Sequence, residues 1–165
     1  MKLTFKEQKM TKWIESGAEA PTFTVACDDG QELSLADLRG TPVVLYFYPK
    51  DDTPGCTIEA CAFRDRKDEI QKLGVHVLGM SPDDVESHAK FRDKFELNFP
   101  LLADIGHSVA EQYGAWREKT RNGQTSMGVH RSTFLIDAAG KVAKVWQDVT
   151  VEGHDEEVLN AVRAL

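Results

Sequence analysis

One apolar segment limits the folds that this chain can adopt. Residues 43–48 read Val-Val-Leu-Tyr-Phe-Tyr as one continuous run, and Pro42 and Pro49 bound it. A strand with one face in water would alternate apolar and polar residues, whereas a short continuous run is typical of a strand buried on both faces. Such a strand needs other elements to cover both sides of its sheet. The run is also far shorter than the ~20 residues that cross a bilayer.

The rest of the chain alternates strands with helices. The turn Asp28-Asp29-Gly30 separates two segments rich in β-forming residues, 22–27 and 31–35, which predicts a hairpin. Helices are predicted over residues 56–73, 82–95, 107–113 and 156–165, and further strands over 75–80, 101–103, 133–137 and 142–146. Ser81 is the predicted N-cap of the second helix, and residues 117–126 suggest no element. We therefore predict an α/β fold with a central mixed β-sheet flanked by helices and an N-terminal β-hairpin.

The length and charge of the chain narrow its organisation and its partners. With 165 residues we expect one domain, formed by residues 17–165 and preceded by an N-terminal extension of residues 1–16. Acidic residues outnumber basic ones by 27 to 20, so the formal net charge is −7. A negative surface repels phosphate groups, which argues against nucleic acid and anionic membranes as partners.

The cysteine content indicates a reducing compartment. Three cysteines are too few, and an odd number, for the disulfide framework of a secreted protein. The first residues lack the apolar segment of a signal peptide, so we expect a cytoplasmic protein. In that setting a pair of cysteines is more often catalytic or metal-binding than structural.

Cys56 lies where the loop after the buried strand enters a predicted helix. Open α/β sheets bind ligands beyond the carboxyl ends of their strands, so this position suits chemistry. The first turn of a helix has unpaired backbone N–H groups and the positive end of the helix dipole, and both favour the nucleophilic thiolate. Gly55 would let a substrate approach the backbone closely. The alternative is that Cys56 is an inert buried side chain.

A second cysteine, Cys61, follows on the same predicted helix. On an intact helix, residues five apart have Cα atoms roughly 8.7 Å apart, beyond the limit of about 7 Å for a disulfide. The two cysteines therefore never pair, or the helix unwinds locally to let them pair. The predicted apolar face of the helix consists of Ile58, Ala62, Phe63, Ile70 and Leu73. Cys61 lies about 130° from its centre and is expected to point towards solvent.

The residues around Cys56 resemble the active-site signature of the peroxiredoxins. The spacing Pro49-x-x-x-Thr53-x-x-Cys56 matches that signature, and Gly55-Cys56-Thr57-x-Glu59-x-Cys61 is similar to the bacterioferritin comigratory protein (PrxQ-like) branch. Further similar segments are Ala20-Pro21-x-Phe23, Tyr113-Gly114-x-Trp116, the stretch 128–137 around Arg131, and Trp146 followed by Gly153-His154. Together they extend the resemblance over about residues 17–165.

The resemblance implies a thioredoxin-like fold and a thiol peroxidase for hydrogen peroxide and organic hydroperoxides. Cys56 would be the peroxidatic cysteine, whose thiolate attacks a peroxide oxygen, releases water or an alcohol and becomes a sulfenic acid. Cys61 would be the resolving cysteine of the same chain, and thioredoxin or a similar dithiol protein would reduce the disulfide. The expected state is a monomer, and neither a metal nor another cofactor is implied.

Three further residues have roles in this expectation. Arg131 would face Cys56, favour its thiolate and donate hydrogen bonds to the peroxide oxygens. Thr53 would exchange hydrogen bonds with the peroxide, cap the helix, or do both. Pro49 would shield the pocket and shape the loop. The ordinary alternatives are a solvated arginine for Arg131 and, for Glu59, whose role the resemblance does not specify, a solvated first-turn acid.

The other reactive residues indicate no second site. The acidic pairs Asp51-Asp52 and Asp83-Asp84 are expected to be solvated. No histidine has metal-ligand spacing to the cysteines, and a structural zinc site needs four ligands where Cys56 and Cys61 supply two. Cys27 is expected to be a structural or incidental thiol.

Two other functions remain as alternatives. A thioredoxin-type dithiol oxidoreductase would use Cys-x-x-Cys, whereas four residues separate Cys56 from Cys61. A peroxide-sensing redox switch or binding module could use the same oxidation of Cys56 to alter a partner surface. Turnover distinguishes them, because a sensor is oxidised once and an enzyme consumes excess peroxide.

Overall fold

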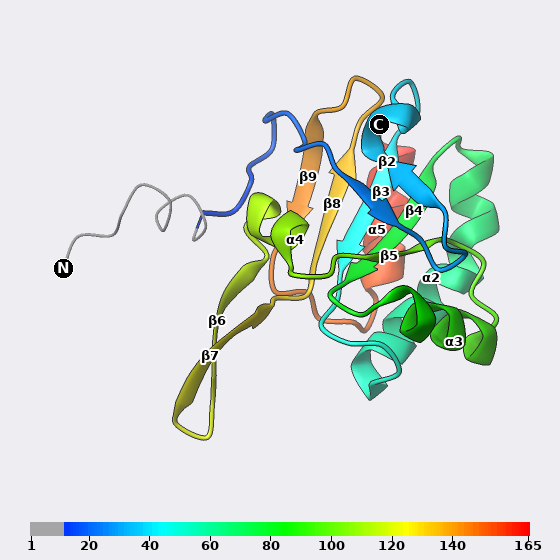
Figure 1. The fold of residues 1–165 in the computed structure, drawn as a ribbon. Coiled ribbons are helices and arrows are strands. Elements are labelled where there is room, and N and C mark those ends of the chain that lie inside the picture. The colour runs from blue at the N-terminus through cyan, green and yellow to red at the C-terminus, as the bar shows by residue number, and fades with distance from the viewer. Residues whose placement is uncertain (1–11) are drawn as a thin grey trace.

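The computed structural model describes residues 12–165 and shows an α/β fold around a five-stranded β-sheet (Figure 1). Residues 1–11, most of the predicted extension 1–16, lie outside the described residues. The strands in spatial order are β5 (Leu101–Ala103), β4 (His76–Ser81), β3 (Val43–Phe47), β8 (Ser132–Ile136) and β9 (Val142–Trp146). β5, β4 and β3 are parallel, whereas β8 is antiparallel to β3 and β9 to β8, so the prediction of a mixed sheet is confirmed.

The position of the central strand β3 explains the apolar run, because its side chains pack into a hydrophobic core on each face of the sheet. Val43, Leu45 and Phe47 pack in the core on one face of the sheet, whereas Val44 and Tyr46 pack in the core on the other. All five are at most 1% exposed. A strand that is covered on both sides has no position where water would favour a polar residue.

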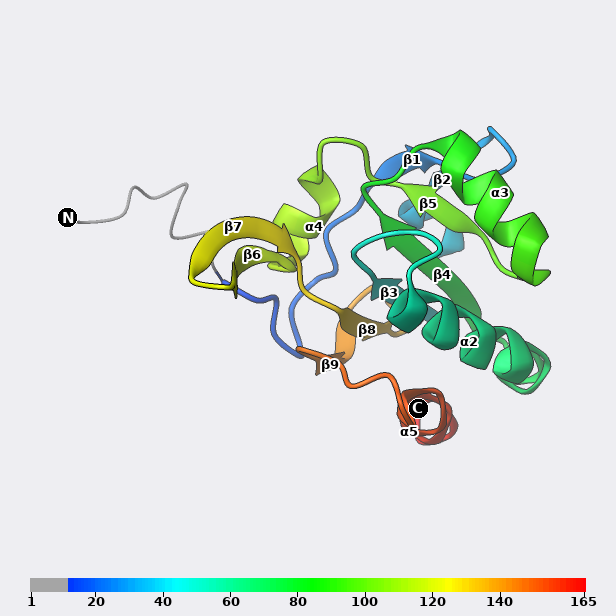
Figure 2. The ribbon, with the colours of Figure 1, turned by 90° about the horizontal axis from the view of Figure 1, so that it is seen from below.

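Helices and a hairpin cover the two faces of the sheet. α2 (Pro54–Lys72) and α5 (His154–Arg163) lie together on one face, with α3 (Val85–Phe95) beside β5 at the edge (Figure 2). The other face is covered by the short helix η1 (Leu35–Leu38), by α4 (Ser108–Tyr113) and by the hairpin of β1 (Thr24–Ala26) and β2 (Glu32–Ser34), the predicted N-terminal hairpin. Within residues 12–165 no helix combines the length and the apolar character that crossing a membrane requires.

A second hairpin, β6 (Trp116–Arg121) with β7 (Gln124–Val129), occupies the segment for which no element was predicted. It extends away from the central sheet (Figure 1). Asn122 and Gly123 form its turn with φ of 51° and 77°, the conformation that Asn-Gly turns adopt readily. Most residues of both strands are exposed or half-buried, so no alternation of apolar residues marks them in the sequence.

The start of α3 differs from the prediction. Ser81 is the last residue of β4, where it pairs with Ala103, and it is not an N-cap. Asp84 is the N-cap, and its side chain accepts a hydrogen bond from the backbone N–H of Ser87 at 2.8 Å. Serine and aspartate cap helices about equally well, so only the pairing of Ser81 in the sheet decides between them.

The buried face of α2 also differs from the prediction. Ile58 and Leu73 are 61% and 47% exposed. The buried residues are Cys56, Glu59, Ala60, Phe63 and Ile70. The buried face therefore includes the carboxylate of Glu59. A prediction that considers only apolar residues leaves Glu59 out and so places the buried face of the helix wrongly. Cys61 is consequently half-buried and not fully turned to solvent.

Candidate active site

Cys56 lies in the first turn of α2, two residues after the helix begins at Pro54. The loop after β3 leads to Thr53, whose extended backbone (φ −100°, ψ 156°) sets the helix start. Proline fits there because the N–H groups of a first turn have no helical partner. Cys56 is only 2% exposed, so its sulfur is shielded from water at the positive end of the helix dipole.

The guanidinium of Arg131 joins Cys56 to Glu59. Arg131 directly precedes β8, whose first residue pairs with the last residue of β3, so the sheet brings Arg131 to the loop that carries Cys56. Its Nη2 donates to the Cys56 sulfur at 3.2 Å and its Nη1 to Glu59 Oε1 at 2.7 Å. A Cβ on Gly55 would lie 3.2 Å from Nη2, so glycine leaves room for the guanidinium. Burial opposes the charge of Arg131, but Glu59 and Cys56 outweigh it and raise the pKa of Arg131.

Glu59 is buried, at 2% exposure, so the alternative of a solvated first-turn acid is wrong. It follows Cys56 by three residues, which places both on the same side of α2. Its Oε1 accepts from Arg131, whereas its Oε2 has no hydrogen-bond partner within residues 12–165. Burial raises the pKa of Glu59 to about 7, because the charge of Arg131 offsets the loss of water only in part.

We expect Glu59→Gln to reduce the pH dependence of folding stability. The pKa of Glu59 in the folded protein, about 7, lies above its ordinary value of 4.5. Its contribution is therefore complete below pH 4.5 and is lost as the pH rises to about 7. The loss is on the order of 3 kcal/mol, from about 1.4 kcal/mol per pKa unit. Urea unfolding across this pH range measures it, with the exposed Glu86→Gln as control. Parallel curves for wild type and Glu59→Gln would contradict the prediction.

A cavity of about 630 Å³ opens over Cys56, and four of the five predicted site residues line it: Pro49, Thr53, Cys56 and Arg131. Thr53 Oγ1 donates to the carbonyl oxygen of Lys50 at 2.9 Å and makes no hydrogen bond to the helix, so the predicted side-chain cap is wrong. The hairpin β6–β7 contributes the wall opposite the loop. The geometry is that of an enclosed thiol with an arginine donor beside it.

The other two cysteines lie outside this cavity. Cys61 is on the same unbroken helix, where roughly 8.7 Å separates the Cα atoms of residues five apart. A disulfide to Cys56 thus requires local unwinding of α2. Cys27 packs in the core on the opposite face of the sheet. Burial first, then Asp29 and Asp28, raise the pKa of Cys27 to about 11, so it is a neutral thiol.

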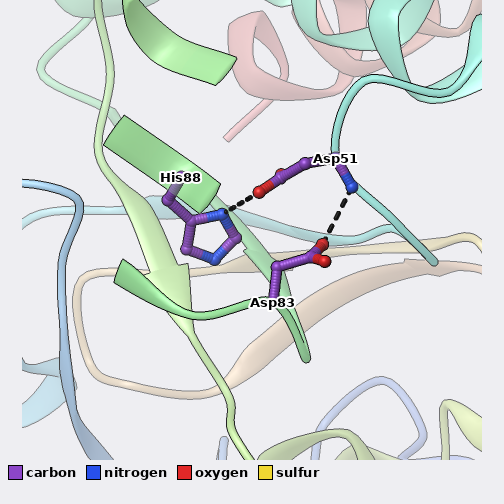
Figure 3. A group of neighbouring side chains, drawn as sticks. All are labelled: Asp51, Asp83 and His88. Atoms are coloured by element: carbon purple, nitrogen blue, oxygen red, sulfur yellow. Dashed lines mark hydrogen bonds and ion pairs between the residues drawn. The ribbon is translucent and has the colours of Figure 1, made fainter. Parts of the chain in front are cut away.

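Asp51 lies in the loop that leads to Cys56 (Figure 3). It is buried, although the sequence predicted a solvated side chain. Its carboxylate lies 2.7 Å from Nδ1 of His88 on α3 and accepts hydrogen bonds from the hydroxyls of Tyr48 and Ser87 at 2.6 and 2.8 Å. Its backbone N–H donates to Asp83 Oδ2 at 2.8 Å. These contacts attach the loop to α3 and to the end of β4.

Both ring nitrogens of His88 have hydrogen-bond partners. Nε2 lies 2.9 Å from the carbonyl oxygen of Leu102, which can only accept, and Nδ1 lies 2.7 Å from Asp51 Oδ2. Ligand atoms of Asp51, Asp83 and His88 lie within 4.8 Å of one another, but the Asp51 carboxylate already bonds to His88 Nδ1, and Asp83 Oδ2 already accepts from the backbone N–H of Asp51. We therefore assign the cluster to holding the loop.

The sequence reasoning missed the buried acids and the hairpin wall. The spacing of Glu59 from Cys56 signals a shared helix face, and the Asn122-Gly123 pair signals a hairpin turn. No comparable signal marks Asp51, because most of its partners come from α3 and from the segment between β4 and α3.

Comparison with known proteins identifies the family of the chain. Residues 16–145 match the AhpC/TSA family. The chain is 47% identical to peroxiredoxin Bcp of Escherichia coli over 147 residues, 89% of this chain and 94% of the relative. It is 45% identical to peroxiredoxin Bcp of Bacillus subtilis over 150 residues, 91% of this chain and 96% of the relative.

A solved structure extends the agreement to the fold. The bacterioferritin comigratory protein of Xanthomonas campestris, described with its alkyl peroxide reduction activity, superposes with a TM-score of 0.86 at 36% identity, covering 91% of this chain and 98% of that one. The fold is accordingly thioredoxin-like, as the resemblance implied. The chain belongs to the AhpC/TSA family and, within it, to the bacterioferritin comigratory protein branch of the peroxiredoxins.

Proposed function

We propose that this protein is a thiol peroxidase that reduces hydrogen peroxide and organic hydroperoxides at Cys56. The thiolate attacks one peroxide oxygen, the S–O bond forms as the O–O bond breaks, and the departing oxygen leaves as water or an alcohol after taking up a proton. The observation that carries the proposal is the Cys56 sulfur, enclosed at a helix N-terminus with the Arg131 guanidinium 3.2 Å away.

Arg131 has the geometry to act on both ends of this reaction. Negative charge moves from the sulfur to the departing oxygen, and a fixed cationic donor beside both stabilises the transition state. The ion pair with Glu59 limits the orientations open to the guanidinium. In this proposal Thr53 and Pro49 shape the cavity above the sulfur, and Thr53 offers its hydroxyl to the peroxide.

We assign Cys61 as the resolving cysteine. Its thiol would condense with the Cys56 sulfenic acid to give an intrachain disulfide and water. Thioredoxin or a similar dithiol protein would then reduce that disulfide and become oxidised itself. The start of α2 must unwind for this step, and local opening costs less free energy than global unfolding.

We expect Cys61→Ser to trap the oxidised enzyme. After one equivalent of hydrogen peroxide the variant should keep a sulfenic acid on Cys56, because the one other thiol of the variant, Cys27, packs in the core on the opposite face of the sheet. Dimedone labelling and mass spectrometry measure it, and wild type should show a Cys56–Cys61 disulfide instead. A Cys27→Ser control should behave as wild type. A Cys56–Cys27 disulfide in the wild type would overturn the assignment of Cys61.

The test of the function as a whole is turnover. Peroxide consumption coupled to thioredoxin and its reductase, with hydrogen peroxide and a bulky organic hydroperoxide side by side, should exceed one equivalent many times. A redox sensor would stop after one equivalent, and that result would favour the alternative.

The setting of the enzyme belongs to the same proposal. We place the catalytic domain at residues 17–165, as a monomer in the cytoplasm. The odd and low number of cysteines, three, suits a reducing compartment. Sedimentation of the reduced protein tests the monomer.

A further inference from the structure

The cavity over Cys56 is strongly cationic although the chain has a net charge of −7. Four basic side chains line it: Lys50, Lys119, Arg121 and Arg131. None of the described residues that line it is an aspartate or a glutamate. Glu59 does not line the cavity, and its ion pair compensates the charge of Arg131 alone.

The other three cations are unpaired. Within residues 12–165, Lys50, Lys119 and Arg121 form no ion pair, whereas nearby acids are engaged elsewhere: Asp52 with Lys94 and Asp148 with His130. Burial first, then the charges of Arg121 and Arg131, lower the pKa of Lys119, whereas Cys56 and Asp148 raise it in part. The cations therefore repel one another across the cavity, and an anion placed among them would relieve that repulsion.

The hairpin turns a polar face to this space. Residues 119 and 121 are two apart on β6 and so share a face, and Ser126 of β7 pairs with Lys119 in register. The stem of Lys119 lies over Gly128, where a Cβ would come within 3.1 Å of it. Apart from Pro49 and Pro54 the lining has no large apolar side chain, so a long hydrocarbon tail would find little to bury against.

We propose that this cavity selects small hydroperoxides that carry a carboxylate, with the carboxylate held by Arg121 and Lys119 while the peroxide lies at Cys56. This inference rests on the proposed function and names its substrate class. A guanidinium matches a carboxylate with two parallel hydrogen bonds, and a nearby ammonium adds attraction without geometric demands. The alternative is that these basic side chains bind an acidic surface of the reducing protein instead of a substrate carboxylate.

A matched set of substrates tests the selection. The set is cumene hydroperoxide with a para-carboxylate, the methyl ester of that compound, and hydrogen peroxide. Oxidation of the pre-reduced protein is followed in a single turnover without any reductant, by rapid quenching, alkylation and mass spectrometry of Cys56. The reducing protein is absent, so it cannot contribute to the rates.

We expect wild type to react with the carboxylate about tenfold faster than with the ester, the equivalent of about 1.4 kcal/mol. The ratio should fall towards one in Arg121→Gln and also in wild type at high salt. Arg39→Gln is the matched control, because it removes the same charge from the end of the sheet opposite Cys56, where Gly40 bonds to Ala138. Its ratio should equal that of wild type.

The outcomes separate the two proposals. A ratio near one in wild type, or one unchanged in Arg121→Gln, overturns the selection while the peroxidase function stands. Equal slowing with all three substrates also overturns it, because Arg121 would then act on the sulfur alone. Failure of wild type to react with any of the three overturns the proposed function itself.

Discussion

Replacing Cys56 by serine should abolish peroxide consumption, with a loss that approaches the ~10⁶-fold at the low end of the range by which enzymes accelerate reactions. A serine hydroxyl at neutral pH is a far weaker nucleophile than a thiolate and forms no sulfenic acid. The measurement is the initial rate of peroxide loss in the coupled thioredoxin assay. The substitution removes little volume, so the fold should survive, and thermal unfolding checks this.

Cys27→Ser provides the matched control for this prediction. Cys27 is a buried thiol on the opposite face of the sheet, with its pKa raised to about 11. Its loss should leave the rate close to that of wild type. Substantial peroxide consumption by Cys56→Ser would show that the nucleophile is elsewhere.

Arg131→Gln should lower kcat/KM for every hydroperoxide by about 10²–10³-fold, the range found when one transition-state donor is removed. The variant loses the donor 3.2 Å from the Cys56 sulfur and the charge beside the departing oxygen. Steady-state kinetics with hydrogen peroxide and with an organic hydroperoxide measures the loss.

A second variant separates this catalytic effect from simple destabilisation. Arg131→Gln leaves Glu59 buried without its partner, so the pKa of Glu59, already about 7, rises further and the acid takes up a proton. A buried polar group that is left unsatisfied in this way costs about 1–3 kcal/mol. The double variant Glu59→Gln/Arg131→Gln removes both charges, so it should regain most of the stability but not the rate. Recovery of the rate together with the stability would mean that Arg131 acts only through the fold.

The part of this site that consists of neighbouring residues could be predicted from the sequence. An apolar run, a proline and a glycine just ahead of Cys56 were enough to place a buried strand, a loop and a thiol at the start of a helix. The physical reason is that each of these preferences acts over a few neighbouring residues. The resemblance to the peroxiredoxins rested on this segment and on more distant ones, among them residues 128–137, which contain Arg131, 75 residues after Cys56.

Contacts between distant segments were beyond such reasoning. The local sequence pattern predicts that Glu59 and Asp51 are exposed, yet both are buried. Glu59 is paired with Arg131, and Asp51 is hydrogen-bonded to His88. The same long-range contacts turned α2 so that Ile58 faces water.

What the sequence alone determined, therefore, is the class of fold, the buried strand and the reactive cysteine at the start of a helix, since these follow from short-range preferences and from the period of apolar residues. Only the tertiary structure decided which charges surround that cysteine. A charged side chain is buried or solvated according to whether a partner meets it, and its partners here come from strands, helices and a hairpin far along the chain.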